Sequence, residues 1–287
     1  MKRLFVISAL VGLLLAVGAP MAGETASTPR HHAADSLTVL TLNIWHDQDD
    51  WPRRRELILD RLQTLEPDIV CLQEVLQNPE LPNQAKTLAD RLGYEFAFAS
   101  VDSVGAAKRY GNAILTRHPI LEENAKRLQP NDDYRVAAHV RLQIGARPVS
   151  IYNTHLHYSG DRSGTAVRST QIRDVLAFVE ATRESDPVIV AGDFNTPPGA
   201  AELDLLSPLL QDAYAMVHPE RATDRPTTLN PYAGHTPRFI DYIFSSTALR
   251  PTAVEILFDE PAADSTWASD HFGVFSRFAF APEPADH

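Results

Sequence analysis

The sequence predicts an α/β sandwich that folds as one domain over residues 37–280. Segments with strand character alternate with segments of helical periodicity, which is the pattern of α/β proteins. The runs Ile69–Leu72 and Val188–Ala191 are continuously apolar, as expected for strands covered on both faces. Hydrophobic residues make up 44% of the 287 residues, which is enough for one large core. No sequence repeat or linker divides 37–280.

The first half of the domain is predicted to alternate between strands and helices. Leu37–Trp45 is rich in leucine and β-branched residues and is the first predicted strand. Asp50 is expected to cap a helix, which Pro67 ends. The apolar run that begins at Ile69 is the second predicted strand. A second helix is expected to stop at Gly93, because glycine favours the left-handed conformation that ends helices.

The second half is predicted to contain strands, one long helix and a segment rich in loops. The long helix carries an apolar stripe that includes Val175 and Val179, and it ends before Pro187. Residues 196–237 are rich in proline, threonine and alanine, which favours loops and short helices. The predicted strands are Gly111–Thr116, Ala137–Ile144, Val149–His155, Val188–Ala191, Phe239–Phe244 and Phe272–Phe278.

Both ends of the chain are predicted to lie outside the fold. Lys2 and Arg3 precede the apolar run Leu4–Val17 and several small residues, which predicts a secretory signal peptide over residues 1–22. An uncleaved membrane anchor is the alternative, although the run is shorter than the ~20 residues that a spanning helix needs. Residues 23–36 predict a flexible linker and residues 281–287 a disordered tail. We therefore expect a secreted or periplasmic protein.

The charge balance restricts the partners of the protein. The formal net charge is −11, and removal of residues 1–22 would make it more negative by two. A protein this acidic has no general attraction for a polyanion, so a phosphate-bearing substrate must be held locally. The single cysteine, Cys71, lies in an apolar run and cannot form an internal disulfide. Nothing in the sequence indicates an obligate protein partner, and we expect a monomer.

Polar side chains gather at the ends of the predicted strands. Ligands of open α/β sheets bind beyond strand ends, so these side chains indicate one shared cleft. Each of them alone has an ordinary explanation, such as a turn or a solvated strand end. His157 is either a second ligand on the face of His155 or part of a polar face. The residues at strand ends are Asn43, Glu74, His155, Asp193 and Asn195.

Seven short motifs occur in order along the chain, and together they are far more specific than any one residue. In this combination the sequence resembles the endonuclease/exonuclease/phosphatase superfamily of metal-dependent phosphohydrolases. The resemblance covers essentially all of 37–280. It implies a four-layer α/β sandwich of two packed mixed β-sheets flanked by helices. The motifs are LNIW at 42–45, LQEV at 72–75, YGNAIL at 110–115, NTHL at 153–156, GDFN at 192–195, IDYI at 240–243 and SDHF at 269–272.

The resemblance also implies a metal site. Glu74 would be the central ligand of a Mg²⁺ or Mn²⁺ ion, supported by Asn43 and Asp270. Oxygen ligands suit these hard cations, which keep several waters and bind substrate phosphate directly. The motif at 42–45 lacks the acidic residue that apurinic endonucleases place two positions after the asparagine. A second metal ligand is therefore absent there.

The remaining motif residues would surround the scissile phosphate. Asp193 would position or deprotonate the attacking water, and Asn195 would donate a hydrogen bond to a phosphoryl oxygen. Asp241 would fix the tautomer of His271, which acts in acid–base chemistry or binds the transition state. The sequence does not decide whether Asp193 or His271 takes the proton of the water.

Other motif residues and several cations could also contact the substrate. His155 would bind a non-bridging oxygen or donate a proton to the leaving group, and Asn112 would lie near the substrate. Five basic residues are each either phosphate contacts or solvated surface cations. They are Lys108, Arg109, Arg135, Arg168 and Arg238.

Three functions were weighed on these residues. A hydrolase of phosphodiester or phosphomonoester bonds, acting on nucleic acid or a small molecule, fits the motifs best. A phospholipid hydrolase resembling neutral sphingomyelinase is the alternative, but the surface is acidic and Trp45, Trp51 and Trp267 are scattered. A binding module without catalysis should have lost at least one core residue, and none is missing.

Overall fold

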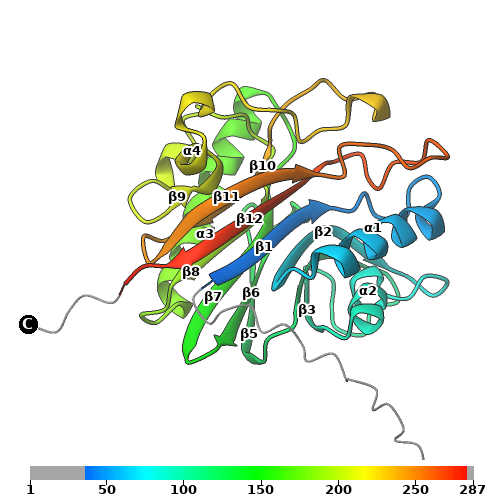
Figure 1. Ribbon diagram of the computed structural model, residues 1–287, viewed down its shortest axis with the longest axis horizontal. Helices are drawn as coiled ribbons and strands as arrows, with labels where there is room; N and C mark the ends of the chain where they lie inside the picture. The colour runs from blue at the N-terminus through cyan, green and yellow to red at the C-terminus, as the bar shows by residue number, and fades with distance from the viewer. Residues whose placement is uncertain (1–35, 283–287) are drawn as a thin grey trace, which may run out of the picture. The chain divides into compact units, whose positions relative to one another are not determined.

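The computed structural model describes residues 36–282, and the strands in this range form two six-stranded sheets (Figure 1). Both sheets contain parallel and antiparallel neighbours. The first sheet has the order β11 (Leu249–Leu257), β12 (Gly273–Phe280), β1 (Ser36–Asn43), β2 (Ile69–Gln77), β4 (Arg109–Thr116) and β3 (Glu95–Ser100). The second has the order β5 (Ile120–Arg127), β6 (Val136–Ile144), β7 (Arg147–His155), β8 (Val188–Asp193), β10 (Asp241–Ser245) and β9 (Gln211–Asp212).

The helices complete a layered sandwich around these sheets. Helices α1 (Trp51–Leu65) and α2 (Gln84–Leu92) form a hydrophobic cluster with the first sheet. Helix α3 (Arg162–Thr182) and the short α4 (Ala213–Val217) belong to the larger cluster, which joins both sheets. The predicted fold class, two mixed sheets packed together and flanked by helices, is confirmed.

Each sheet has a parallel pair of strands at its centre. Strands β1 and β2 are parallel and connected by α1, whereas β7 and β8 are parallel and connected by α3. All other neighbours are antiparallel. The carboxyl ends of the four parallel strands carry Asn43, Glu74, His155 and Asp193, so the topology places the predicted polar residues at matching positions of the two sheets.

Buried amide side chains hold the two sheets together. Gln73 donates from Nε2 to Asn153 Oδ1 at 2.7 Å, which links β2 to β7. Asn153 in turn donates to the carbonyl oxygens of Leu72 and Ala113, at 2.9 and 2.8 Å. Gln73 and Asn153 are fully buried. Because a buried amide must be hydrogen-bonded, these contacts favour one registration of the sheets and disfavour sliding.

The helix ends follow the chemistry expected from the sequence. The Asp50 carboxylate accepts a hydrogen bond from the amide of Arg53 at 3.2 Å, as an N-cap does. Gly93 ends α2 with a left-handed φ of 70°. The first strand is shorter than the predicted Leu37–Trp45, since it ends at Asn43 and the backbone then turns at Trp45 with a φ of 56°.

Most of the segments predicted for the two chain ends lie outside the described residues. The signal peptide at 1–22 and most of the linker at 23–36 lie outside this range, as do residues 283–287 of the tail. The linker prediction is wrong at Ser36, which pairs with Ala279 as the first residue of β1. Within 36–282, no helix is both long and apolar enough to cross a membrane.

Candidate active site

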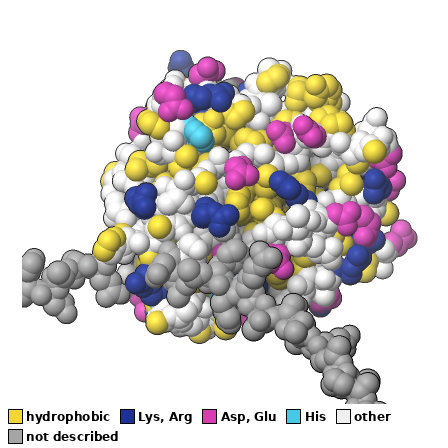
Figure 2. All heavy atoms as spheres, viewed as in Figure 1, with side chains coloured by type: hydrophobic (Ala, Val, Ile, Leu, Met, Phe, Trp, Pro, Cys, Tyr) yellow, Lys and Arg dark blue, Asp and Glu magenta, His cyan; other side chains and the backbone are white. Residues whose placement is uncertain are grey.

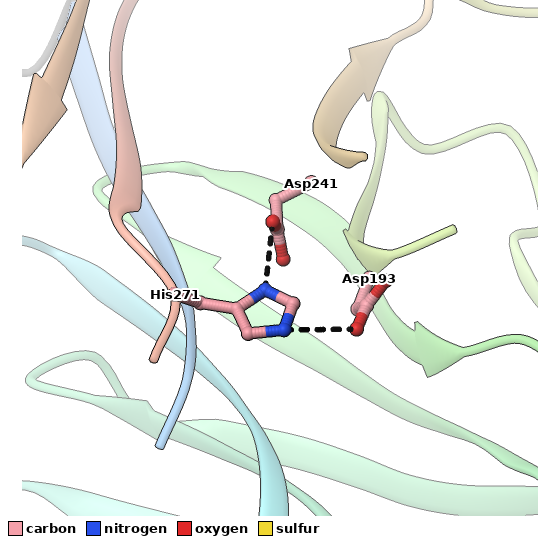
Figure 3. Close-up of side chains that lie close together, drawn as sticks. All are labelled: Asp193, Asp241 and His271. Atoms are coloured by element: carbon pink, nitrogen blue, oxygen red, sulfur yellow. Dashed lines mark hydrogen bonds and ion pairs between the residues drawn. The ribbon is translucent and has the colours of Figure 1, made fainter. Parts of the chain in front are cut away.

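Three buried side chains meet where the two sheets end, and they come from distant parts of the chain (Figure 3). Asp241 is the first residue of β10, Asp193 the last of β8, and His271 lies two residues before β12. The Asp241 Oδ2 atom lies 3.0 Å from His271 Nδ1. The other ring nitrogen, Nε2, points toward Asp193 Oδ2 at 3.8 Å. The imidazole is therefore held between two carboxylates.

Burial and neighbouring charges set the ionisation of this trio. Burial acts to lower the pKa of His271, but the carboxylates of Asp241, Asp193 and Asp270 together outweigh it, Asp241 most strongly, and raise the pKa to about 10. His271 is therefore a cation at neutral pH. Burial, followed by repulsion from Asp241, raises the pKa of Asp193 to about 7. Asp193 can thus gain or lose a proton near neutrality, a property suited to acid–base chemistry.

The second predicted histidine also contacts Asp193. His155 Nε2 lies 3.3 Å from Asp193 Oδ2, and Asn43 Nδ2 donates to the same oxygen at 3.2 Å. Burial, with a smaller effect of Arg135, lowers the pKa of His155 well below its usual value. His155 is therefore neutral at neutral pH. Its Nδ1 is buried without a hydrogen-bond partner among the described residues.

The turn after β8 shapes the floor of the site. Asp193 Oδ1 accepts a hydrogen bond from the amide of Asn195 at 2.9 Å, and Asn195 has a left-handed φ of 53°. A Cβ atom on Gly192 would lie 1.9 Å from the carbonyl oxygen of Thr154, so only glycine fits there. Asn195 also donates from Nδ2 to Leu156 O at 3.1 Å. All five predicted catalytic residues therefore belong to one connected region.

A bulge in β2 determines where Glu74 points. The pairing of β2 with β4 shifts between Leu72 and Val75, and Glu74 has a φ of 58°, which is uncommon for a residue with a side chain. The strained backbone turns the carboxylate out of the regular strand pattern. It lies 3.9 Å from His46 Nε2. Burial raises the pKa of Tyr110, and the neighbouring Glu74 carboxylate raises it further.

Asp270, the third predicted metal ligand, contacts His235 and Ser269. Its Oδ2 lies 3.0 Å from His235 Nε2, and its Oδ1 accepts a hydrogen bond from the Ser269 hydroxyl at 3.3 Å. The same hydroxyl donates to Asn43 O at 2.6 Å, which connects Asp270 to the end of β1. The sequence did not predict a role for Ser269 or His235.

The donor chemistry of this region suits a hard divalent cation. Asn43, Glu74 and Asp270 supply oxygen atoms, as Mg²⁺ and Mn²⁺ prefer. A second arrangement is also present, because ligand atoms of Asp193, Asp241 and His271 lie within 4.8 Å of one another. Asp241 Oδ1 is buried without a hydrogen-bond partner in the described chain. These residues could hold a metal ion, and the assignment of the ligands to Asn43, Glu74 and Asp270 stays a prediction.

Two other residues singled out in the sequence are engaged in structural contacts. Asn112 is buried, and its Nδ2 donates to Val136 O at 2.8 Å, which connects β4 to β6 across the sandwich. His157 lies beyond the end of β7, where its Nδ1 is 2.9 Å from Asp133 Oδ2. A contact of Asn112 with substrate stays a prediction.

The five candidate cations have different environments. Arg168 is buried, and its Nη2 atom lies 2.9 Å from a carboxylate oxygen of Glu202, so it is neither a phosphate contact nor a surface cation. Arg109 lies over the ring of Phe98, and Arg238 is exposed. Lys108 lines a groove of about 670 Å³ together with other residues. That groove is also lined by His46 and Tyr110, the two partners of Glu74.

Arg135 is the candidate cation whose charge acts on His155, the histidine that contacts Asp193. It is 9% exposed, and its Nε has no hydrogen-bond partner in the part of the chain that the structure describes. Its charge acts on both His155 and Tyr110. A buried guanidinium with an unpaired donor favours binding of an anion.

A buried arginine positions the loop that follows β1, and the sequence analysis missed it. Arg54 on α1 is fully buried and donates to the carbonyl oxygens of Ile44, at 2.7 Å, and of Ala268, at 3.1 Å. It also donates to three carbonyls of the turn at 45–48. Arg54 thus connects the neighbours of Asn43 to the neighbours of Ser269. Only its place in the apolar pattern of α1 could have indicated burial.

We expect Arg54→Ala to be among the more destabilising single substitutions in this chain. It leaves several buried carbonyl groups without donors and creates a cavity, so the free energy of unfolding should fall by about 3–5 kcal/mol. The melting temperature should fall by roughly 6–20 °C. Arg53→Ala is the matched control, since its pair with Asp264 is exposed and worth less than about 1 kcal/mol. Equal melting temperatures for the two variants would contradict the role of Arg54.

Comparison with known proteins agrees with this geometry. A model of the endonuclease/exonuclease/phosphatase family matches residues 40–271, which is most of the chain. The chain belongs to the endonuclease/exonuclease/phosphatase family. The family predicted from the seven motifs is therefore confirmed, and the matched range contains every predicted site residue from Asn43 to His271.

The individual relatives share little sequence identity with this chain. The protein angel of Drosophila melanogaster is 28% identical over 180 residues, which cover 58% of this chain and 50% of angel. The uncharacterized protein YbhP of Escherichia coli K12 is 30% identical over 175 residues, covering 56% and 67%. The structure of D. rerio TDP2 complexed with a single-strand DNA product has a TM-score of 0.71 at 21% identity and covers 85% of this chain and 98% of its own. It supports the fold alone.

Proposed function

We propose that this protein hydrolyses phosphoester bonds by adding water to phosphorus, with a divalent metal ion bound beside the reacting groups. The observation that carries the proposal is the buried trio in which Asp241 holds His271 against Asp193. Family membership supports the reaction class. The chain spans about half the length of angel, so the activity of the whole relative does not transfer without a test.

The ionisation of the trio suggests a role for each group. Asp193, with a pKa of about 7, takes the proton of the attacking water. His271 is held as a cation by Asp241 and stabilises the negative charge that develops on the phosphoryl oxygens. Neutral His155, whose Nε2 lies 3.3 Å from Asp193 Oδ2, would donate its single N–H to a non-bridging oxygen of the bound phosphate.

The remaining anionic charge requires further cations. A divalent ion bound by Asn43, Glu74 and Asp270 would neutralise charge on the phosphate and favour attack by water. The bulge at Glu74 supports this proposal, because a strained backbone conformation is commonly retained where it serves function. Arg135 would contact the same phosphate through its unpaired Nε.

The substrate is proposed to be a single-stranded nucleic acid or a small phosphoester. On the face seen in Figure 2, basic and acidic side chains are interspersed, and that face has no extended basic patch. With a net charge of −11, broad electrostatic binding of a duplex is disfavoured. The single-strand DNA product bound to the structurally similar TDP2 makes single strands a natural first choice. Sphingomyelin remains the alternative substrate.

A panel of substrates tests the proposed function. The purified protein with Mg²⁺ or Mn²⁺ is assayed against bis-p-nitrophenyl phosphate, single-stranded DNA, RNA, inositol phosphates and sphingomyelin vesicles. We expect turnover of at least one phosphodiester, and Asp193→Asn should abolish it. The proposal fails if no phosphoester is cleaved, or if Asp193→Asn cleaves as fast as the unchanged protein.

We also propose that the protein is exported. The proposal rests on Lys2, Arg3 and the apolar run Leu4–Val17, which have the pattern of a signal peptide. N-terminal sequencing of protein recovered outside the cytoplasm should begin between Pro20 and Ala26. Soluble cytoplasmic protein that retains Met1 would refute export.

A further inference from the structure

A stacked pair of aromatic rings, the exposed Tyr232 and the half-buried Trp267, borders the loop that carries His271. Tyr232 stacks on Trp267 with ring centroids 5.0 Å apart and an angle of 13° between the ring planes. Trp267 also contacts Phe272, at 5.8 Å. Tyr232 remains 77% exposed, although one face of its ring is covered by Trp267. Because most of the Tyr232 side chain is exposed while one face of its ring lies against Trp267, the opposite face is accessible to solvent.

The backbone holds this aromatic pair in a defined position relative to the catalytic trio. Asn230 donates from its amide to Asp270 O at 2.9 Å and from Nδ2 to Ser269 O at 3.2 Å. Its Oδ1 accepts a hydrogen bond from the amide of Tyr232 at 2.9 Å. Leu229 forms an isolated β-bridge with His271. The turn that presents Tyr232 is therefore attached directly to the segment that presents His271.

We propose that Tyr232 and Trp267 form a stacking platform for a nucleobase next to the scissile phosphate. The inference rests on the proposed function and adds that the substrate is a single-stranded nucleic acid. A base presents a flat π-face, and stacking on exposed aromatic rings is a general mode of single-strand binding that tolerates any sequence. The two protein rings are nearly parallel, so a base on the open face of Tyr232 continues the same stack.

The geometry disfavours the main competing ligand, a quaternary ammonium group of a phospholipid. Such cations are recognised by several rings that surround the charge as a cage. Tyr232 and Trp267 instead offer one flat face, because they cover each other. The nearby His235 and Asp270 are already paired with each other at 3.0 Å. A flat neutral ring therefore fits this surface better than a bulky cation.

Two substrates that differ only in their bases test the platform. One is a five-nucleotide oligothymidine, and the other is a five-unit abasic phosphodiester with the same number of phosphates. The measured quantity is kcat/KM for oligothymidine divided by kcat/KM for the abasic substrate. We expect Tyr232→Ala to lower this ratio roughly 5- to 150-fold, the loss expected for one base–aromatic stack. Tyr232→Leu should lower it similarly, whereas Tyr232→Phe should keep it. Because Tyr232 is exposed, the melting temperatures should be equal.

A binding measurement separates this inference from the proposed hydrolase function. Oligothymidine added in the presence of a chelator should quench tryptophan fluorescence, and Trp267→Phe should remove most of that quenching. If the protein cleaves bis-p-nitrophenyl phosphate but the Tyr232→Ala ratio is unchanged, the platform is overturned while the hydrolase stands. Quenching without turnover of any phosphoester supports the platform and rejects the hydrolase. A selective loss of sphingomyelin hydrolysis in Tyr232→Ala would overturn the platform in favour of a lipid headgroup.

Discussion

Replacement of Asp241 by asparagine should lower kcat by a factor on the order of 10²–10⁴, and the corresponding change in a serine-protease triad costs about 10⁴. The Asp241 carboxylate is fully buried and contacts His271 Nδ1 at 3.0 Å. An amide of the same volume does not stabilise the imidazolium form of His271. The loss should therefore appear mainly in kcat, since the interaction matters most in the transition state.

The fold of Asp241→Asn should be intact, and this separates a chemical effect from a structural one. The substitution keeps the side-chain volume, so circular dichroism should be unchanged, but it removes the partner of the buried His271 cation and should lower the melting temperature. In a double-mutant cycle, Asp241→Asn should add little to His271→Gln, because the two residues act as a unit. Asp259→Asn, on an exposed loop, is the control. A folded Asp241→Asn protein with near-normal kcat would remove the Asp241–His271 pair from the mechanism.

Chelation of divalent metal should abolish turnover, and added Mg²⁺ or Mn²⁺ should restore it. A cation bound by the proposed ligands Asn43, Glu74 and Asp270 would screen their negative charge, and without it the substrate phosphate would face the carboxylates of Glu74 and Asp270 directly. Glu74→Gln should raise the Mg²⁺ concentration needed for half-maximal activity by at least about 10–100-fold. That is the loss of metal affinity found when a residue that only hydrogen-bonds to a metal ligand is changed.

Controls distinguish a metal used in the reaction from one needed for folding. Glu80→Gln, an exposed glutamate just after β2, should need the same Mg²⁺ concentration as the unchanged protein. Circular dichroism should be unaffected by the chelator, because the hydrophobic core supports the fold by itself. Full turnover in excess chelator would end the metal proposal, and unfolding by the chelator would reassign the ion to a structural role.

The strands that the sequence predicted lie inside the sheets, and the strands that it did not predict lie at their edges. The eight predicted strands all lie inside the sheets, whereas β3, β5, β9 and β11 are the four edges. An interior strand is buried on both faces and has an apolar signature. Strand β5 instead reads ILEENAKR and is largely exposed, β11 contains Pro251, and β9 has two residues. Charges and proline on edges discourage pairing with other chains, and they also remove the pattern that predicts a strand.

The sequence predicted the catalytic trio, but it did not predict the backbone features that position the site. The motifs contain the trio, and the structure brings Asp193, Asp241 and His271 together as their roles require. The bulge at Glu74 was not predictable, because a shift of register depends on the pairing with β4 rather than on local sequence. The positioning role of Arg54 depends on carbonyl groups as distant as Ala268. The sequence alone does not reveal which backbone groups such a side chain will meet.

The pairing of β1 with β12 has a consequence for how the protein acquires activity during synthesis. These strands join residues 36 and 279, so the first sheet closes across nearly the whole length of the domain. Contacts of such high sequence separation form slowly, because the entropy of closing a long loop must be overcome first. His271 also enters the site just ahead of β12. A ribosome-bound chain that lacks its last strand therefore has no complete active site, and refolded protein should regain turnover only with the last phase of folding.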